Sequence, residues 1–396
     1  MQPSDPVVIV SVARTPMGRY QGQLAGLSAA ELGAAAIQAA VARSGMPAGR
    51  VSHVQMGCAL PEASGWDPAR QAGQRAGISL LARSNTIGKG SASGMAAAVL
   101  AHDALLGGSR ALAVAGGMES MSSAPERVLV ARGGYLRHSA RATVGQQLRG
   151  GGDLPARLVA AAVERCAQAL GFSREARAAY AAESRQRMRA AVAEAAFGWE
   201  IAPVRLPGEG GALLQADEWA DGLHAPAHTA DAEHADPSGP ADGATWARDA
   251  SHLADGAAAL VLARRSIAER LGLAPLAIIA GHATHATTPS LFPLAPVGAI
   301  RRLLSKTGWG VRDVQAWEIG ETFAVVPMAA MKQLSIDPEI LNAHGGACAL
   351  GHPMGASGAR LIVTLLGCLC RTGRRRGVAS QCMEGGGAMA VALEML

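Results

Sequence analysis

Residues 345–358 read GGACALGHPMGASG and place one histidine, His352, among glycines and other small residues just before an apolar helix. Glycine lets a backbone come close to a ligand or a neighbouring element, and a neutral imidazole can accept a proton near neutral pH. A histidine in such a loop can therefore sit next to a reacting group. The stretch predicts a helix of the core with a candidate catalytic base beside its N-terminal end.

The sequence also contains a weak internal duplication. Ser93-Gly94 matches Ser357-Gly358, and Met118-Glu119 matches Met383-Glu384. The spacing between the two runs of the first half differs by one residue from the spacing between the two runs of the second half. A third pair has almost the same offset: Gln55-Met56-Gly57 with Glu318-Ile319-Gly320. Because self-similarity of this kind marks a repeated structural unit, we expect two halves of one βα topology, packed about a pseudo-twofold axis.

Local signals predict a layered α/β protein. Short β-rich runs at 7–10 and 278–280 alternate with helical stretches, which favours mostly parallel sheets flanked by helices. Ser28 and Glu31 have the spacing of a helix-capping pair, and Gly45 is a plausible end of the same helix.

Composition limits the classes of function. The 396 residues are 49% hydrophobic and 17% charged, which is enough for a large core. The N-terminus lacks a signal-peptide pattern, and the apolar runs fall short of the roughly 20 residues of a membrane span. We therefore expect a cytoplasmic protein that neither spans nor binds a membrane. The six cysteines lack zinc spacing, so reduced thiols are expected.

Charge and histidine clusters give weaker signals. The net charge is +5, but the basic runs 185–189 and 374–376 lack interleaved aromatic residues, so nucleic acid is not expected. Each run is either a solvated face or a docking surface for a phosphorylated cofactor or an acidic carrier protein. His224, His228 and His234 lie in a polar segment without ordered partners, so no metal is predicted.

Four motifs together resemble the thiolases. They occur in thiolase order and span nearly the whole chain: Arg14-Thr15-Pro16-Met17-Gly18, residues 116–122 (GGMESMS), residues 255–260 (DGAAAL), and the histidine stretch of 345–358. The resemblance implies a five-layered αβαβα fold with two duplicated βα halves and an inserted loop domain. It implies an N-terminal half over 1–120, completed by about 250–270, a loop domain over 121–249 and a C-terminal half over 271–396.

The resemblance also implies three catalytic positions, which here are Ser91, His352 and Cys382. In thiolases the first is a cysteine that takes the acyl group, the histidine activates it, and the second cysteine moves a proton at the substrate carbon. Ser91 stands in KGSASGM, residues 89–95, in place of the nucleophilic cysteine. A serine hydroxyl stays protonated and needs a base in contact, which His352 would supply.

Further positions follow from the same resemblance. Gly320 replaces an asparagine that, in thiolases, holds a water at the thioester oxygen, and losing one such donor costs about 2.7 to 4 kcal/mol of transition-state stabilisation. Glu384 replaces the first glycine of a triplet; with Gly385 it is assigned to a second oxyanion site, and its carboxylate is either a base or bound to nearby backbone. Four residues are assigned to substrate binding: Ser251, Ala250, Met118 and Phe323.

The expected function is an acyltransferase that takes an acyl group from a pantetheine thioester and forms a carbon–carbon bond by Claisen-type chemistry. Because an oxygen ester on Ser91 is more stable than a thioester, return of the acyl group to a thiol is disfavoured and a biosynthetic direction is favoured. Three alternatives stay open: transfer to a hydroxyl or amine, a cysteine-to-serine trap of a natural thiolase, and a non-catalytic partner subunit.

The expected partners follow from this chemistry. Acyl-coenzyme A or an acyl-carrier protein is the substrate carrier, and no further cofactor is expected because the glycine clusters lack nucleotide-binding spacing. By analogy with thiolases the chain forms a homodimer or a homotetramer.

Overall fold

The computed structural model describes residues 4–108, 112–124, 127–128, 141–142, 156–208, 210–219, 249–383 and 385–396. His224, His228, His234 and Glu384 lie outside the described residues, as does much of the predicted loop domain. Strands from both ends of the chain join in one mixed sheet, in the order β12-β13-β14-β11-β1-β10-β5-β3-β4. The two halves meet where β1 pairs with β11 over a short register.

Each half contributes its own group of strands to this sheet. The first half contains β1 (Val7–Arg14), β3 (Val51–Gly57), β4 (Arg83–Ile87), β5 (Leu112–Ser120) and β10 (Ala254–Arg264), with β2 (Gly18–Arg19) beside β10. The second contains β11 (Ala277–Ala286), β12 (Ala316–Ile319), β13 (Arg376–Met383) and β14 (Gly387–Met395).

The strand pairing confirms the predicted duplication. In the first half β3 runs parallel to β5, β5 antiparallel to β10, and β10 antiparallel to β1. In the second half β12, β13, β14 and β11 repeat these three pairings in the same order. Even the irregularities match, because the register shifts between Ile9 and Ser11 in β1 and between Ile279 and Gly281 in β11.

The expectation of mostly parallel sheets is wrong. Antiparallel pairs predominate among the described strands, and the link between β13 and β14 shows why. Only residues 384–386 separate these strands, and Gly386 has a φ of +90°. A link this short joins antiparallel neighbours, since a parallel crossover needs a dozen or more residues.

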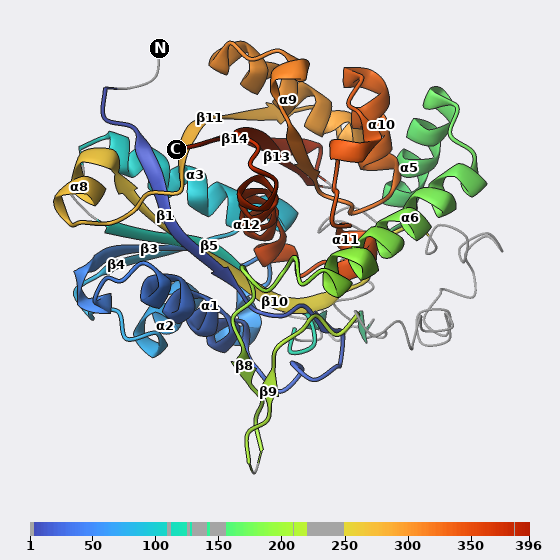
Figure 1. Cartoon of the computed structure of the whole chain (residues 1–396). Helices are drawn as coiled ribbons and strands as arrows, with labels where there is room; N and C mark the ends of the chain where they lie inside the picture. Colours follow the sequence, from blue (N-terminus) through green and yellow to red (C-terminus); the bar gives the residue numbers. More distant parts are fainter. Residues whose placement is uncertain are drawn as a thin grey trace, which may run out of the picture.

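Helices complete five layers (Figure 1). On one outer face lie α1 (Ala29–Arg43) and α2 (Pro68–Arg75); α3 (Ser93–Leu106) and α12 (Met354–Thr372) lie between the two halves of the sheet; α9 (Ala295–Thr307) and α10 (Val325–Leu334) cover the other outer face. Three separate apolar clusters fill the spaces between these layers. The predicted five-layered αβαβα architecture is confirmed.

Two helices show how the sequence signals work. Ser28 accepts a hydrogen bond from the Glu31 N–H while the Glu31 carboxylate accepts one from the Ser28 N–H, so the predicted capping pair opens α1. Gly45, with a φ of +73°, follows the end of that helix. By length and composition α12 resembles a membrane span, but 83% of the relevant window is buried inside the fold, as in a core helix.

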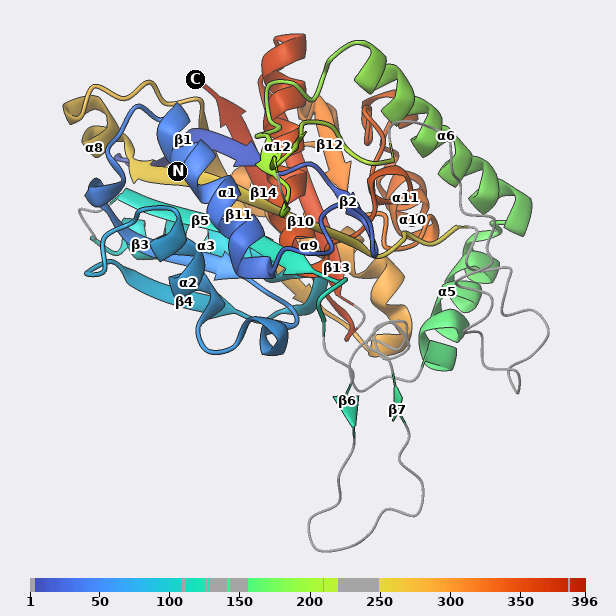
Figure 2. The ribbon, with the colours of Figure 1, turned by 90° about the horizontal axis from the view of Figure 1, so that it is seen from below.

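The remaining helices and strands lie outside the layers. They are α5 (Ala156–Leu170), α6 (Arg174–Ala193), α8 (Arg265–Arg270), α11 (Ala347–Leu350), and the short pairs β6 (Arg127–Val128) with β7 (Arg141–Ala142) and β8 (Val204–Arg205) with β9 (Leu213–Leu214). Figure 2 shows α5 and α6 together on one side, beside α10 and α11. Buried Arg14 forms ion pairs with Glu200 and Asp217, which ties the segment after α6 to β1.

Candidate acyl-transfer site

The N-terminal ends of α3 and α12 meet at the centre of the molecule because small residues allow it. A Cβ built on Gly94 would lie 2.8 Å from the Gly355 carbonyl oxygen, and one on Gly117 would lie 2.0 Å from the same atom. Likewise, a Cβ on Gly358 would lie 2.7 Å from the Met95 nitrogen. The glycines of the sequence motifs therefore serve close packing, and they bring the loops before the two helices together.

Ser91 and His352 occupy these two loops. Ser91 lies in a 3-10 turn, η3 (Gly90–Ala92), directly before α3, and His352 lies two residues before α12. The Ser91 Oγ is 2.8 Å from His352 Nε2, and the two residues are 0% and 5% exposed. The structure thus brings the predicted nucleophile and base into direct contact, away from bulk water.

A second serine determines which imidazole nitrogen carries the proton. The Ser357 Oγ lies 3.0 Å from the Pro353 carbonyl oxygen and 2.7 Å from His352 Nδ1. A carbonyl can only accept, and in the arrangement in which Ser357 donates its proton to this oxygen, the Ser357 Oγ accepts a hydrogen bond from Nδ1–H. This arrangement leaves the Nε2 lone pair facing the Ser91 hydroxyl, as a general base requires.

The electrostatics keep this base neutral. Burial, with a smaller contribution from the positive charge of Arg360, lowers the pKa of His352 to about 4. The imidazole is therefore unprotonated at neutral pH. Negative charge that develops nearby is favoured by the N-terminal ends of α3 and α12, because helix N-termini carry partial positive charge.

Cys382 lies on β13, against which the Ser91 turn packs. Its side chain is fully buried, and Sγ is 3.6 Å from Thr322 Oγ1. Segment 249–253 connects the neighbouring loops: the Ser251 N–H donates to the Thr322 carbonyl oxygen, and the His352 N–H donates to the His252 carbonyl oxygen. Cys382 and the Ser91–His352 pair therefore border one region of the fold.

Gly320 follows β12, next to β13. A Cβ built there would lie 2.1 Å from Gln381 Oε1, so the carboxamide of Gln381 fills the space that a side chain at 320 would occupy. Gly385 lies in the exposed turn between β13 and β14, with no described atom within 4 Å of its built Cβ.

The four residues assigned to substrate binding have different surroundings. Ser251 is partly buried, and its Oγ donates to the Thr322 carbonyl oxygen. Ala250 forms a backbone bridge with Phe323, whose ring packs edge-on against Phe292. Met118 is fully buried in the outer core against Gly33 of α1, so the structure does not bring its side chain to the Ser91–His352 pair.

Sequence reasoning missed three polar residues of this region: Ser357, Gln381 and Glu119. The Glu119 carboxylate accepts hydrogen bonds from the N–H groups of Ala59, Leu60 and Gly355, which anchors the start of α12. Burial outweighs these bonds and raises the pKa of Glu119 to about 7. Ser357 lies within the first quoted stretch, and a helical spacing of four from Pro353 was the available signal.

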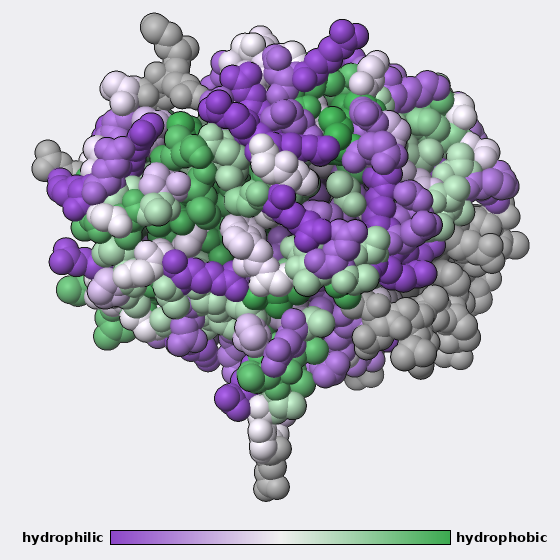
Figure 3. Space-filling view, in the orientation of Figure 1, coloured by the Kyte–Doolittle hydropathy of each residue, from purple (hydrophilic) through white to green (hydrophobic). Residues whose placement is uncertain are grey.

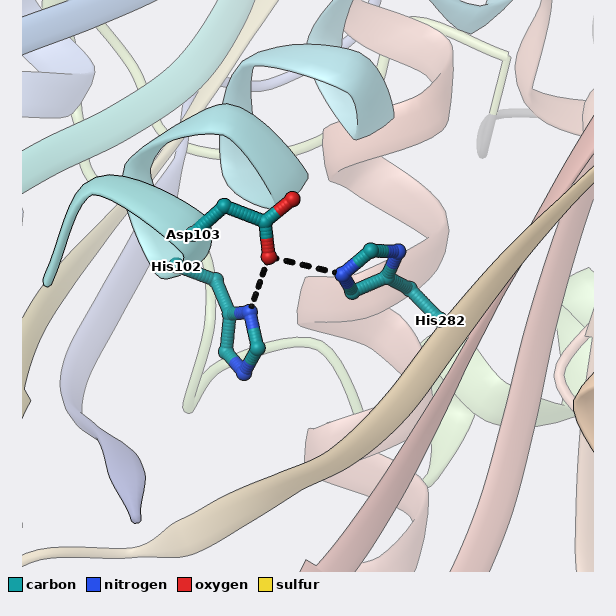
Figure 4. A group of neighbouring side chains, drawn as sticks. All are labelled: His102, Asp103 and His282. Atoms are coloured by element: carbon teal, nitrogen blue, oxygen red, sulfur yellow. Dashed lines mark hydrogen bonds and ion pairs between the residues drawn. The ribbon is translucent and has the colours of Figure 1, made fainter. Parts of the chain in front are cut away.

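One cluster outside this region joins α3 to β11 (Figure 4). The Asp103 Oδ1 lies 2.9 Å from His102 Nδ1 and 2.8 Å from His282 Nε2. Among the described residues, this is the one group of His, Cys, Asp or Glu side chains whose ligand atoms lie close enough together to bind a metal ion. The Lys306 ammonium donates to the His282 carbonyl oxygen and places positive charge beside it. These hydrogen bonds connect α3 of the first half to β11 of the second half.

The basic run 185–189 lies on α6, where hydrophilic side chains gather in Figure 3. Arg187 forms an ion pair with Glu183 and donates to the carbonyl oxygens of Pro338 and Leu341. Similarly, in the run 374–376, Arg376 pairs with Glu394 and covers the Trp309 ring. Part of each run therefore has a structural role at a solvated face.

Comparison with known proteins agrees with this geometry. Residues 7–266 match the family description "Thiolase, N-terminal domain", and residues 273–395 match "Thiolase, C-terminal domain". The chain is 40% identical to acetyl-CoA acetyltransferase 1 of Arabidopsis thaliana, over 100% of this chain and 95% of that protein. It is 37% identical to the acetyl-CoA acetyltransferase of Cupriavidus necator, over 98% and 99%.

Solved structures give the same result. The chain is similar to the Acat5 thiolase of Ascaris suum in complex with coenzyme A, with a TM-score of 0.87, 34% identity, and coverage of 99% of this chain and 100% of that one. It is also similar to the Bacillus anthracis acetyl-CoA acetyltransferase, with a TM-score of 0.91, 31% identity and 99% coverage of both chains. The chain therefore belongs to the thiolase family.

Proposed function

We propose that this protein is an acyltransferase that receives an acyl group from a pantetheine thioester on Ser91 and passes it to a carbon nucleophile. The observation that carries the proposal is the 2.8 Å contact between Ser91 Oγ and the free nitrogen of His352. A buried serine with a correctly oriented base has the arrangement of an activated nucleophile.

In the first half-reaction Ser91 Oγ attacks the thioester carbonyl carbon while His352 Nε2 takes its proton. The Nδ1–H···Ser357 hydrogen bond supports the imidazolium that forms. The tetrahedral intermediate then expels the pantetheine thiolate, which receives the proton from His352. The products are an oxygen ester on Ser91 and a free thiol.

In the second half-reaction Cys382, as a thiolate, removes a proton from the α-carbon of a second acyl thioester. The carbanion attacks the ester carbonyl on Ser91, a carbon–carbon bond forms, and the Ser91 alkoxide leaves. The proton that Cys382 removed passes to this alkoxide through His352, so that Cys382 returns to the thiolate and Ser91 to the hydroxyl. The buried position of Cys382 on β13, beside the Ser91 turn, supports this role. Because an oxygen ester is more stable than a thioester, return of the acyl group from Ser91 to a thiol, the step that thiolysis requires, is disfavoured, and we propose the biosynthetic direction on this ground.

Acetyl-coenzyme A is the first donor to test. The curated relatives are named acetyl-CoA acetyltransferases, and one similar structure is a complex with coenzyme A. A carrier protein with the same pantetheine arm is the second donor, and no other cofactor is proposed. A homodimer or homotetramer and a cytoplasmic location remain predictions.

The test is intact-protein and peptide mass spectrometry after incubation with acetyl-coenzyme A and, separately, an acetylated carrier protein. Wild type, Ser91→Ala and Ser91→Cys are compared. We expect an acetyl group on Ser91 that resists neutral hydroxylamine, as an oxygen ester does, and no adduct in the alanine variant. Labelling of the cysteine variant alone would indicate a trapped thiolase, and no labelling of any variant would indicate a non-catalytic partner.

A further inference from the structure

The carboxamide of Gln381 is confined at the edge of the acyl-transfer site. Gln381 is 1% exposed, and its Oε1 lies where a side chain at position 320 would begin, 2.1 Å from the built Cβ. Residue 320 can therefore carry a side chain only if Gln381 moves. The two positions, on neighbouring strands or strand ends, form one structural unit.

The hydrogen bonds of this carboxamide determine its orientation. Gln381 Nε2 lies 3.2 Å from the Cys382 carbonyl oxygen and 3.3 Å from Thr322 Oγ1. Because a carbonyl can only accept, the NH2 group must face Cys382 and Thr322. Its two protons are then used, and Oε1 is left without a hydrogen-bond donor among the residues that the structure describes.

The chemistry of the site requires a donor that these contacts do not supply. In the tautomer fixed by Ser357, His352 Nε2 carries no proton when Ser91 begins its attack. The thioester oxygen gains negative charge at that moment, and a donor must already be in place to stabilise it. An amide oxygen that no described residue donates to can hold an ordered water, which has a second proton to donate.

We propose that Gln381 is a positioning residue whose Oε1, in the space left by Gly320, holds a water that donates a hydrogen bond to the thioester oxygen. This inference rests on the proposed acyl transfer to Ser91. In this arrangement Thr322 and the Cys382 carbonyl oxygen fix the carboxamide, and Gly320 leaves room for it. The carboxamide is thus supplied from position 381 and not from 320.

The test compares Gln381→Leu, Gly320→Asn and the double variant. The readouts are the rate constant and half-saturating donor concentration for Ser91 acylation by rapid-quench mass spectrometry. Gln381→Leu should slow acylation about tenfold to a hundredfold, because the transition state loses a water-mediated donor. The half-saturating donor concentration should stay within about twofold of the wild-type value, because the ground state does not depend on that donor. Gly320→Asn should also slow it, since its side chain meets Gln381. The double variant moves the carboxamide to 320 and should recover to within about fivefold of wild type.

Gln55→Leu is the matched control, because Gln55 is a buried glutamine on β3, and it should leave the acylation rate unchanged. If Ser91 is acylated in Gln381→Leu at the wild-type rate, the inference is overturned. So would a slow Gln381→Leu whose defect the double variant does not repair, since that result indicates packing alone. If only the Ser91→Cys background is acylated, the serine proposal fails and Gln381 is judged in that background. If neither background is acylated, both proposals fail.

Discussion

The Ser357 hydroxyl lies 2.7 Å from His352 Nδ1 and also contacts the Pro353 carbonyl oxygen one helical turn earlier. Together these contacts orient the imidazole and place its proton on the side away from Ser91. They extend the Ser91–His352 contact into a relay of three side chains. Ser357 plays the part that an orienting group plays behind the histidine of a catalytic triad, but without a negative charge.

Ser357→Ala should therefore impair catalysis more than folding. We expect the rate constant for Ser91 acylation to fall about tenfold to a hundredfold, with little change in half-saturation, because the imidazole loses its fixed tautomer. Ser11→Ala is the control, since Ser11 also donates to a buried carbonyl oxygen, that of Ala40. Stopped-flow release of the free thiol gives the rate. Equal rates for the two variants would show that Ser357 does not orient the base.

The pH dependence should reveal the buried imidazole. Because the pKa of His352 is lowered from 6.5 to about 4, the neutral base persists down to acidic pH. Acylation by His352 should thus not decline through pH 6.5, and its loss should come near pH 4. The measurement is the single-turnover rate between pH 4 and 8. A midpoint at 6.5 would contradict the buried, neutral base.

The same pKa shift affects stability with a definite sign. The unfolded chain binds a proton at His352 below pH 6.5, whereas the folded chain does not until about pH 4. The contribution of His352 to the unfolding free energy is therefore unaffected above pH 6.5 and falls as the pH drops from 6.5 towards 4. In urea unfolding, the difference in unfolding free energy between wild type and His352→Asn should change with pH only across that interval.

Gly94→Ala should separate the two catalytic loops. The new Cβ would lie 2.8 Å from the Gly355 carbonyl oxygen and 3.0 Å from Ala359 Cβ, so α3 and α12 must move apart. We expect a loss of about 1 to 3 kcal/mol in unfolding free energy, typical of overpacking, and slower acylation. Gly49→Ala is the control, because no described atom lies within 4 Å of its built Cβ. Chemical denaturation and the acylation rate would measure both effects.

The layered fold was predicted from the alternation of β-rich and helical runs and from the resemblance of the motifs to thiolases, and the structure shows that the motif glycines allow close contacts. The duplicated runs around Ser93-Gly94 and Ser357-Gly358 correspond to the two central helices, and their small residues meet in the structure. The sense of the strands was predicted wrongly, because alternating β-rich and helical runs favoured parallel sheets and Gly385 was assigned to an oxyanion site and not to a tight turn. Gly385 and Gly386 lie in the tight turn that forces β13 and β14 to run antiparallel.

Side-chain direction limited the prediction of the site. Met118 belongs to a motif that borders α12, but neighbouring strand residues face opposite sides. Gly117 therefore faces Gly355, while Met118 faces Gly33 on α1. Gln381 could not be found from spacing, because its role depends on contact with Gly320 from a distant part of the chain. Such contacts arise only once the strands are paired.

Cys382→Ala distinguishes carbon chemistry from transfer to a hydroxyl or amine. If Cys382 is the proton shuttle, the variant should still acylate Ser91 at a rate within about threefold of wild type. It should lose more than about a hundredfold in exchange of the acetyl methyl protons of acetyl-coenzyme A with deuterated water, since general acid–base catalysis contributes about that much. Mass spectrometry measures both. Cys166→Ala replaces another buried cysteine and should change neither rate. Equal exchange rates in wild type and Cys382→Ala would show that Cys382 does not remove the proton from the α-carbon. Acyl transfer to a hydroxyl or amine, which needs no carbanion, would then account better for a serine at position 91.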